Sequence, residues 1–150
     1  MIAIDTDVLA IYHLFCHDQR YEATTSFMKT SRSTERATTV YNIMELAGIL
    51  SAAGKSAEAK RILTTYVSAG DMHILYPSLP LQTPELFWVE YCAGVMAVME
   101  RGLRYGDAKI LWVAESHDCT TLVTWNTAHY RDRTPLPVMT PQEFCSCHGS

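Results

Sequence analysis

Three carboxylates and one amide, far apart in the chain, are the residues most able to share one chemistry. They are Asp5, Glu45, Asp107 and Asn126. Two unit charges about 4 Å apart repel by about 4 kcal/mol at an effective dielectric of about 20, and a divalent ion would offset that repulsion. Oxygen ligands without His or Cys favour Mg²⁺ or Mn²⁺ over Zn²⁺. Such an ion generates hydroxide and stabilises charge on a phosphodiester, so the set indicates metal-dependent phosphodiester hydrolysis.

Predicted strands and helices alternate along the chain and place these four residues near element boundaries. The predicted strands are Met1–Ile4, Ala37–Tyr41, Met72–Tyr76, Thr121–Trp125 and an edge strand at Val138–Met139. The predicted helices are Val8–Phe15, Tyr21–Lys29, one from Asn42 to near Gly54, Ala57–Ser68, Leu86–Arg101 and one that begins at Asp107. This alternation predicts an α/β fold, a three-layer α/β/α sandwich with a central, mostly parallel sheet. Because ligands bind beyond the carboxyl ends of strands in such sheets, this fold can gather the four residues.

Local signals at the helix ends add detail to this prediction. We expect Thr6 or Asp7 to cap the first helix, and Asn42 to form a capping box with Glu45 at the third helical position. Gly70 is expected to end the helix before the third strand. The polar segments 30–36 and 76–84 are predicted to be loops. The helix over 86–101 is largely apolar, so we expect it to be central.

Each proposed site residue also has an ordinary explanation. Asp5, Glu45 and Asp107 could each only cap a helix or occupy a turn, and helix capping is the simpler explanation for Asn126 alone. Glu45, however, shares a helix face with small and apolar residues, and an acid directed at an apolar layer needs a partner. The prediction of a shared site therefore depends on the four residues taken together.

The composition indicates one globular domain in the reducing cytoplasm. The chain has 150 residues, 48% of them hydrophobic, and a net charge of −4. That charge argues against a dominant electrostatic attraction to nucleic acid or to an anionic membrane. The five cysteines indicate free thiols, although Cys145, Cys147 and His148 together could bind a metal. We expect no signal peptide, because Asp5 comes too early for an uninterrupted apolar core and there is no basic leader. We expect no membrane span, because Glu90 interrupts the most apolar run.

The segments that carry the four residues resemble a PIN-domain ribonuclease, most closely the VapC type of toxin. They are IDTDVL at Ile4–Leu9, NIMELAGIL at Asn42–Leu50, YGDAKILWVAES at Tyr105–Ser116 and LVTWNTAHY at Leu122–Tyr130. The resemblance covers residues 1–145 and leaves 146–150 as a C-terminal tail. It implies Mg²⁺- or Mn²⁺-dependent cleavage of single-stranded or loop RNA, with Asp5, Glu45 and Asp107 as metal ligands.

The resemblance also implies supporting residues and partners. Thr6 and Thr124 would be supporting polar groups, although Thr124 is also explained as an ordinary strand residue. Toxins of this type usually form homodimers and are silenced by a cognate antitoxin that inserts a segment into the active-site groove. Two positions depart from the family. Asn126 replaces a frequent Asp and should weaken the binding of a second metal. Asp7, where Asn is common, could restore a charge near the site as a supporting polar group, but capping of the first helix is the favoured explanation.

Cations and aromatic residues near the proposed site are candidates for contacts with RNA. Phosphates require cations, and unpaired bases stack on aromatic rings. The candidates are Arg104, Lys109, Trp125, His129 and Arg131, together with Arg32, Arg36, Arg101, Arg133 and Tyr130. Surface arginines and buried aromatic residues also occur for structural reasons, so these assignments are the least specific.

Other classes of function stay open on the sequence alone. A phosphatase of the haloacid-dehalogenase type would use Asp5 as a nucleophile and Asp7 as an acid and base, and would form a phosphoaspartate. A non-catalytic binding module would use the carboxylates only as helix caps. A PIN-domain nuclease that processes RNA without an antitoxin is the mildest alternative.

Overall fold

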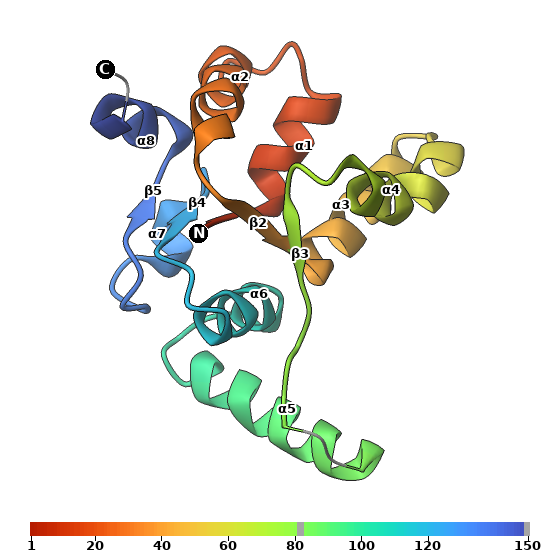
Figure 1. Cartoon of the computed structure of the whole chain (residues 1–150), viewed down its shortest axis with the longest axis vertical. Helices are drawn as coiled ribbons and strands as arrows, with labels where there is room; N and C mark the ends of the chain where they lie inside the picture. Colours follow the sequence, from red (N-terminus) through yellow and green to blue (C-terminus); the bar gives the residue numbers. More distant parts are fainter. Residues whose placement is uncertain (81–82, 149–150) are drawn as a thin grey trace.

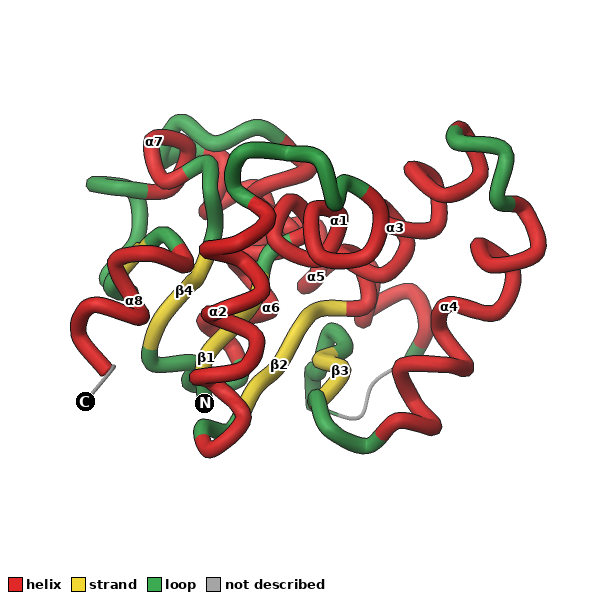
Figure 2. The backbone as a smooth tube through the Cα atoms, turned by 90° about the horizontal axis from the view of Figure 1, so that it is seen from above, coloured by secondary structure: helices red, strands yellow, loops and turns green. Residues whose placement is uncertain are grey.

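A sheet of five parallel strands lies at the centre of the computed structural model, which describes residues 1–80 and 83–148. The strands are β1 (Ile2–Ile4), β2 (Arg36–Thr39), β3 (His73–Leu75), β4 (Thr121–Val123) and β5 (Val138–Met139). Their order in the sheet is β3-β2-β1-β4-β5, and Figure 2 shows β4, β1, β2 and β3 side by side. Helices lie on both sides of this sheet (Figure 1). The predicted three-layer α/β/α sandwich is therefore confirmed.

Helices connect the strands and continue beyond the last one. They are α1 (Thr6–Leu14), α2 (Tyr21–Thr30), the 3-10 helix η1 (Ser31–Ser33), α3 (Val40–Ala52), α4 (Ser56–Ala69), α5 (Pro84–Met99), α6 (Tyr105–Ser116), α7 (Thr127–Tyr130) and α8 (Pro141–His148). The loop predicted over 76–84 includes residues 81 and 82, which lie outside the described residues. The same holds for residues 149 and 150 of the predicted tail, whereas 146–148 belong to α8.

Two hydrophobic cores lie on opposite faces of the sheet. Successive residues of a strand point to opposite faces, so Ile2 and Ile4 pack with Leu46 in one core and Ala3 packs with Leu111 in the other. Residues of α1, α2, α3, α4 and α8 complete the first core. Residues of α5, α6 and α7 complete the second. The short strand β1 is therefore buried on both faces, as expected for a parallel sheet.

Two helices start differently from the prediction, and both differences involve capping. The Thr39 hydroxyl accepts a hydrogen bond from the Asn42 backbone N (3.2 Å), and Asn42 Oδ1 accepts one from the Thr39 backbone N (3.0 Å). This capping box ends β2 and starts α3, so the predicted box between Asn42 and Glu45 is wrong. Helix α1 is capped by Asp5, whose side chain accepts from the Thr6 backbone N, rather than by Thr6 or Asp7.

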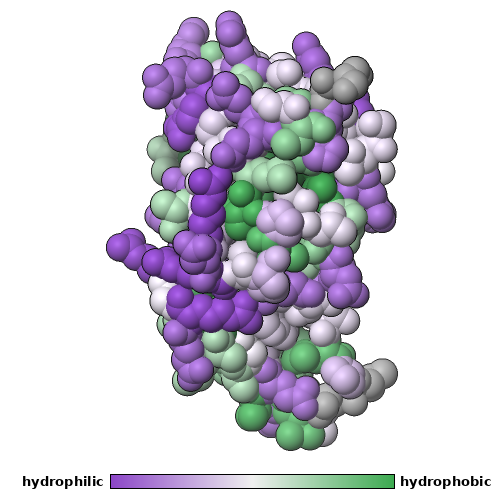
Figure 3. Space-filling model, turned by 90° about the vertical axis from the view of Figure 1, so that its left-hand side faces the viewer, coloured by the Kyte–Doolittle hydropathy of each residue, from purple (hydrophilic) through white to green (hydrophobic). Residues whose placement is uncertain are grey.

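Helix α5 lies at one end of the molecule, so the prediction that it is central is wrong. Figure 1 shows it beyond α6, and apolar surface gathers at the same lower end in Figure 3. The exposed apolar side chains of α5 are Leu86, Trp88, Val89, Met96 and Met99. A helix that is apolar all round is usually buried, but an apolar outer face can also be an interaction surface. No helix in the described part of the chain is both long and apolar enough for a membrane span.

The packing of α5 on α6 requires glycine at one position. A Cβ added at Gly94 would lie 2.8 Å from Cε2 of Trp112. Gly94→Ala is therefore expected to lower the free energy of unfolding by about 1–3 kcal/mol through overpacking. Gly48→Ala is the control, because Gly48 lies in α3 with nothing within 4 Å of an added Cβ, and it should stabilise by about 0.5–1 kcal/mol. Urea denaturation measures both changes, and equal effects would contradict this packing constraint.

Candidate active site

The carboxyl ends of β1, β2 and β4 meet at one edge of the sheet, and the proposed residues lie there. Asp5 follows β1, the helix that carries Glu45 follows β2, and Thr124 follows β4. Strand β1 pairs with both β2 and β4, so the three ends are neighbours. The chain connections diverge on either side of β1, and ligands of open parallel sheets bind at such a position.

Asp5 lies in a buried hydrogen-bond network. Asp5 is only 6% exposed. Oδ1 accepts from the Thr6 backbone N at 2.7 Å and from Asn42 Nδ2 at 3.0 Å, and Oδ2 accepts from the Thr124 hydroxyl at 2.8 Å. Donors from α1, α3 and the end of β4 therefore fix the orientation of this carboxylate.

Thr6 and Asn42 connect Asp5 to Glu45. Asn42 Nδ2 also donates to the Thr6 hydroxyl oxygen at 3.0 Å, and the Thr6 hydroxyl donates to Glu45 Oε2 at 2.7 Å. Glu45 Oε1 lies 3.6 Å from Lys109 Nζ. Asn42 is fully buried and contacts the site directly, whereas the sequence indicated only a capping role for it.

Asp107 lies in the first turn of α6, and its carboxylate already has two partners. Oδ2 is 3.3 Å from His129 Nδ1, and Oδ1 accepts a long hydrogen bond of 3.5 Å from the Tyr130 hydroxyl. Both partners belong to α7, which follows β4. The unit from α6 through β4 to α7 therefore returns the chain to Asp107, as the position of Asn126 predicted.

The phenol of Tyr130 is a common neighbour of the carboxylates. Tyr130 is 1% exposed. Burial raises the pKa of this phenol, and the negative charges of Asp5, Asp107, Asp7 and Glu45 raise it further. Its burial prevents the stacking on RNA bases that the sequence allowed, so that assignment is wrong. No local pattern indicated that Tyr130 would be a buried contact of Asp107.

Asp7 stabilises the end of β4 rather than the start of α1. Its Oδ2 accepts from the backbone N of Trp125 (2.9 Å), the backbone N of Asn126 (3.0 Å) and the Thr124 hydroxyl (3.2 Å). Its Oδ1 is buried and has no hydrogen-bond partner among the described residues. Burial raises the pKa of this carboxyl. The prediction that Asp7 caps the first helix is therefore wrong, because its donors lie in the segment after β4.

Two substitutions of Asp7 test this role. Asp7→Asn keeps an acceptor oxygen and removes a buried charge, so it should leave the protein at least as stable at neutral pH. Asp7→Ala leaves the Trp125 N–H without its acceptor, and an unsatisfied buried group costs about 1–3 kcal/mol. Because the charge of Asp7 contributes to the raised pKa of Asp5, Asp7→Asn should also lower that pKa, which NMR titration of the carboxyl measures. Equal loss of stability in both variants would exclude the acceptor role.

Negative charge accumulates at this edge of the sheet. Burial, followed by repulsion from Asp7 and from Glu45, raises the pKa of Asp5 to about 7. Hydrogen bonds from Thr124 and Thr6 act in the opposite direction, because they stabilise the ionised carboxylate. A cation at this position would therefore reduce an existing electrostatic penalty.

The donor chemistry fits a hard divalent cation, although the side chains do not form a complete ligand set in this arrangement. Within residues 1–80 and 83–148, no three His, Cys, Asp or Glu side chains are grouped closely enough to hold one ion. Lys109 contacts Glu45 and His129 contacts Asp107 instead. The carboxylates of Glu45 and Asp107 must therefore turn away from these two side chains before they can share an ion with Asp5.

Asn126 and the candidate RNA-binding residues occupy different parts of this region. Asn126 is exposed and is the N-cap residue of α7, as predicted, but its side chain makes no capping hydrogen bond. Arg104 and His129 line a surface hollow of about 320 Å³ beside Asp107. Lys109 lies between the rings of Tyr41 and Tyr105, at 5.0 and 5.5 Å from their centroids.

The side chains of Trp125 and Arg131 are directed elsewhere. Trp125 Nε1 donates to the Thr24 hydroxyl of α2 at 3.0 Å, and its ring belongs to the first core. Arg131 forms an ion pair of 2.8 Å with Glu143 of α8. Cys145 and Cys147 are free thiols. Arg104, Lys109 and His129 therefore border the carboxylates, whereas the side chains of Trp125 and Arg131 contact other elements.

Solved structures share this architecture, whereas no family model and no curated protein sequence matches the chain. FitAB bound to an IR36 DNA fragment contains a chain with a TM-score of 0.62 and 17% identity, over 95% of this chain and 96% of that one. A chain of a toxin–antitoxin complex from Klebsiella pneumoniae has a TM-score of 0.62 and 19% identity, over 95% of this chain and 99% of that one. A chain of VapBC-1 from nontypeable Haemophilus influenzae has a TM-score of 0.62 and 16% identity, over 94% of this chain and 98% of that one. This chain therefore shares its fold with these chains, as its sequence resemblance predicted.

Proposed function

We propose that this protein is a metal-dependent endoribonuclease that cuts single-stranded or loop RNA and is the toxin of a toxin–antitoxin pair. The strongest support is the hydrogen-bond network at the carboxyl edge of the sheet, where Asn42 and Thr6 connect Asp5 to Glu45. The hydroxyl of the buried Tyr130 contacts Asp107 at the same edge. The similarity of the fold to chains of toxin–antitoxin complexes supports the biological role.

The oxygens of Asp5, Glu45 and Asp107 would hold Mg²⁺ or Mn²⁺, with the amide oxygen of Asn126 as a neutral fourth ligand. When bound, such an ion lowers the pKa of water and stabilises charge on a phosphodiester. Because Asn126 is neutral and exposed, it contributes less than a carboxylate to any second ion. No covalent intermediate with the protein is needed for this hydrolysis.

Neighbouring polar groups set the orientation of the acids. Thr124 and Asn42 hold the two oxygens of Asp5, and Thr6 holds Glu45 Oε2. These donors leave little freedom to the Asp5 carboxylate, so the least mobile acid lies at the centre of the site. Such preorganisation lowers the cost of placing a reacting phosphate.

Three nitrogen-bearing side chains at the rim are suited to RNA phosphates. Lys109 Nζ lies 3.6 Å from Glu45 Oε1 and His129 Nδ1 lies 3.3 Å from Asp107 Oδ2, and a divalent ion bound to these acids would release both side chains for the substrate. Arg104 is exposed beside the same hollow. The overall acidic charge predicts weak general affinity for RNA. The contribution of this rim to RNA binding should fall as the salt concentration rises.

Incubation of the purified protein with a panel of structured RNAs tests the activity. Cleavage is expected with Mg²⁺ or Mn²⁺ and not with a chelator, and Asp5→Asn, which keeps the side-chain shape, should abolish it along with Asp5→Ala. A contaminating nuclease would cut RNA equally in all preparations, and that result would overturn the proposal. A phosphoaspartate trapped on Asp5 would instead establish the phosphatase alternative.

The exposed apolar side chains of α5 support a protein partner, and we propose a second copy of the chain. Trp88 is 59% and Val89 64% exposed, and neighbouring apolar side chains of this kind mark interaction sites. Sedimentation should therefore show a dimer that Trp88→Glu converts to a monomer. Glu58→Gln on the exposed surface of α4 should leave the dimer intact, and a monomer at all concentrations would contradict this assignment.

A further inference from the structure

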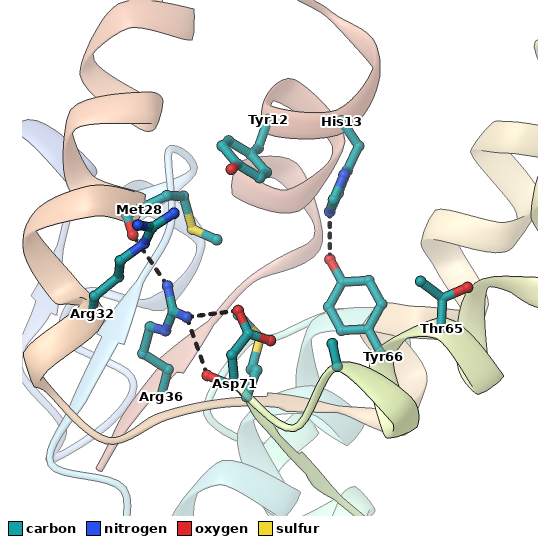
Figure 4. Close-up of a pocket in the computed structure, with 10 residues that line it drawn as sticks. Tyr12, His13, Met28, Arg32, Arg36, Thr65, Tyr66 and Asp71 are labelled. Atoms are coloured by element: carbon teal, nitrogen blue, oxygen red, sulfur yellow. Dashed lines mark hydrogen bonds and ion pairs between the residues drawn. The ribbon is translucent and has the colours of Figure 1, made fainter.

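A cavity of about 170 Å³ lies between α1, α2, α4 and the residues before β3, away from the carboxylate cluster. Tyr12 and His13 of α1, Met28 of α2 and Tyr66 of α4 line it (Figure 4). Arg36, the first residue of β2, lies at its base. The cavity is therefore near the amino ends of the strands, whereas Asp5 lies beyond their carboxyl ends.

The base of the cavity carries a buried positive charge. The Arg36 side chain is 5% exposed. Its Nη1 donates to the Met28 carbonyl at 3.1 Å, and its Nη2 donates to the Asp71 carbonyl at 3.1 Å and to Asp71 Oδ2 at 2.9 Å. Asp71, in contrast, is 64% exposed. The buried guanidinium of Arg36 is thus paired with one carboxylate that remains mostly in water. This ion pair offsets the cost of burying the positive charge only in part.

A second guanidinium lies on the same wall. Arg32 of η1 lines the cavity next to Arg36 (Figure 4), and its side chain has no hydrogen bond or ion pair with the described residues. His13 adds no charge at neutral pH, because burial lowers its pKa and its Nε2 contacts the Tyr66 hydroxyl at 2.7 Å. Two guanidinium groups face one carboxylate, so the lining has an excess of one positive charge.

The other walls are apolar or aromatic. Met28 and Met72 are nearly fully buried, and Tyr66 is 8% exposed. The volume is close to that of an apolar cavity of about 150 Å³ that holds benzene. A single ring therefore fits the space, and the adjacent guanidinium groups suit a carboxylate, which arginine binds through paired N–H groups.

We propose that this cavity binds a small organic monoanion, a single-ring carboxylate whose acid group pairs with Arg32 and Arg36. The ring lies between Met28 and the aromatic side chains of Tyr12 and Tyr66. The carboxylate supplies the one negative charge that the lining lacks. This site is independent of the nuclease activity, because none of its residues belongs to the carboxylate cluster.

Benzoate is the probe, and benzamide is its neutral counterpart of the same shape. Titration of the folded protein, followed by NMR, should shift the ring signals of Tyr12 and His13 with benzoate and leave them nearly unchanged with benzamide. Arg32→Ala should weaken benzoate binding about tenfold, because it removes one charge-assisted contact. Arg32 is exposed, so this substitution should not disturb folding.

Lys29→Ala is the matched control, because it removes an exposed cation from the adjoining turn of α2. Lys29→Ala should leave benzoate affinity unchanged. This result would separate a general effect of surface charge from a direct contact between Arg32 and benzoate. Equal binding of benzamide and benzoate, or unchanged affinity in Arg32→Ala, would overturn the proposal. So would benzoate shifts confined to residues outside this cavity.

Discussion

RNA cleavage should fall more than a hundredfold when Glu45 is replaced by Gln. Glutamine keeps the size of the side chain and an oxygen that can accept from the Thr6 hydroxyl, so the fold should be retained. It removes the negative charge that a divalent ion needs. Loss of a group that only orients a metal ligand lowers metal affinity or activity about 10–100-fold. Loss of the ligand itself should lower the cleavage rate by more than that. Single-turnover cleavage with Mn²⁺ measures the effect.

Glu58→Gln and Lys109→Met serve as the controls for Glu45. Glu58 is an exposed carboxylate of α4, and its replacement should leave the cleavage rate unchanged. Lys109→Met removes the ammonium that lies 3.6 Å from Glu45 Oε1. This variant should bind Mn²⁺ more tightly by calorimetry, because the ammonium no longer competes for that oxygen. Unchanged Mn²⁺ affinity in both Glu45→Gln and Lys109→Met would contradict a metal site at Glu45.

Much of the fold follows from local signals that tertiary packing reinforces. Apolar, β-branched or aromatic runs of two to five residues between helical patterns predicted all five strands, and Val138–Met139 indeed pairs with β4 at the sheet edge. Gly70 ends α4 in the left-handed conformation (φ 67°), as its position after the helix predicted. The location of α5 could not be predicted, because hydrophobicity reports the tendency to be buried and does not specify the partner that buries a face.

The candidate site was predictable in part, because the strands that position its acids were predictable. Acids placed after strands in a parallel sheet must share an edge, which located Asp5 and Glu45. The roles of Asn42 and Tyr130 depend on contacts between residues far apart in the chain, and a single sequence contains no signal for such pairs. Asp7 was misjudged because a carboxylate near a helix start fits capping equally well, whereas only the approach of β4 shows its backbone donors.

Without divalent ions, the protein should lose stability as pH rises from about 4 to about 7. Burial, followed by the charge of Asp7, raises the pKa of Asp5 from 3.8 to about 7. Between these values the folded protein holds a proton that the unfolded chain has released, so the free energy of unfolding falls as pH rises. The decrease from this group is at most about 1.4 kcal/mol per pH unit. The stabilisation is complete below the pKa of the unfolded chain and is lost through the folded pKa.

Asp5→Asn isolates this contribution from all other titrating groups. The variant cannot ionise at position 5, so its free energy of unfolding should change less between about pH 5 and about pH 8 than that of the unsubstituted protein. Chemical denaturation with a chelator at both pH values measures the difference. Added Mg²⁺ should then stabilise the unsubstituted protein more at the higher pH, because the ion binds the ionised carboxylate. Parallel pH profiles of the two proteins would show that Asp5 is not a buried acid with a raised pKa, and the electrostatic reason for a cation at this edge would be lost.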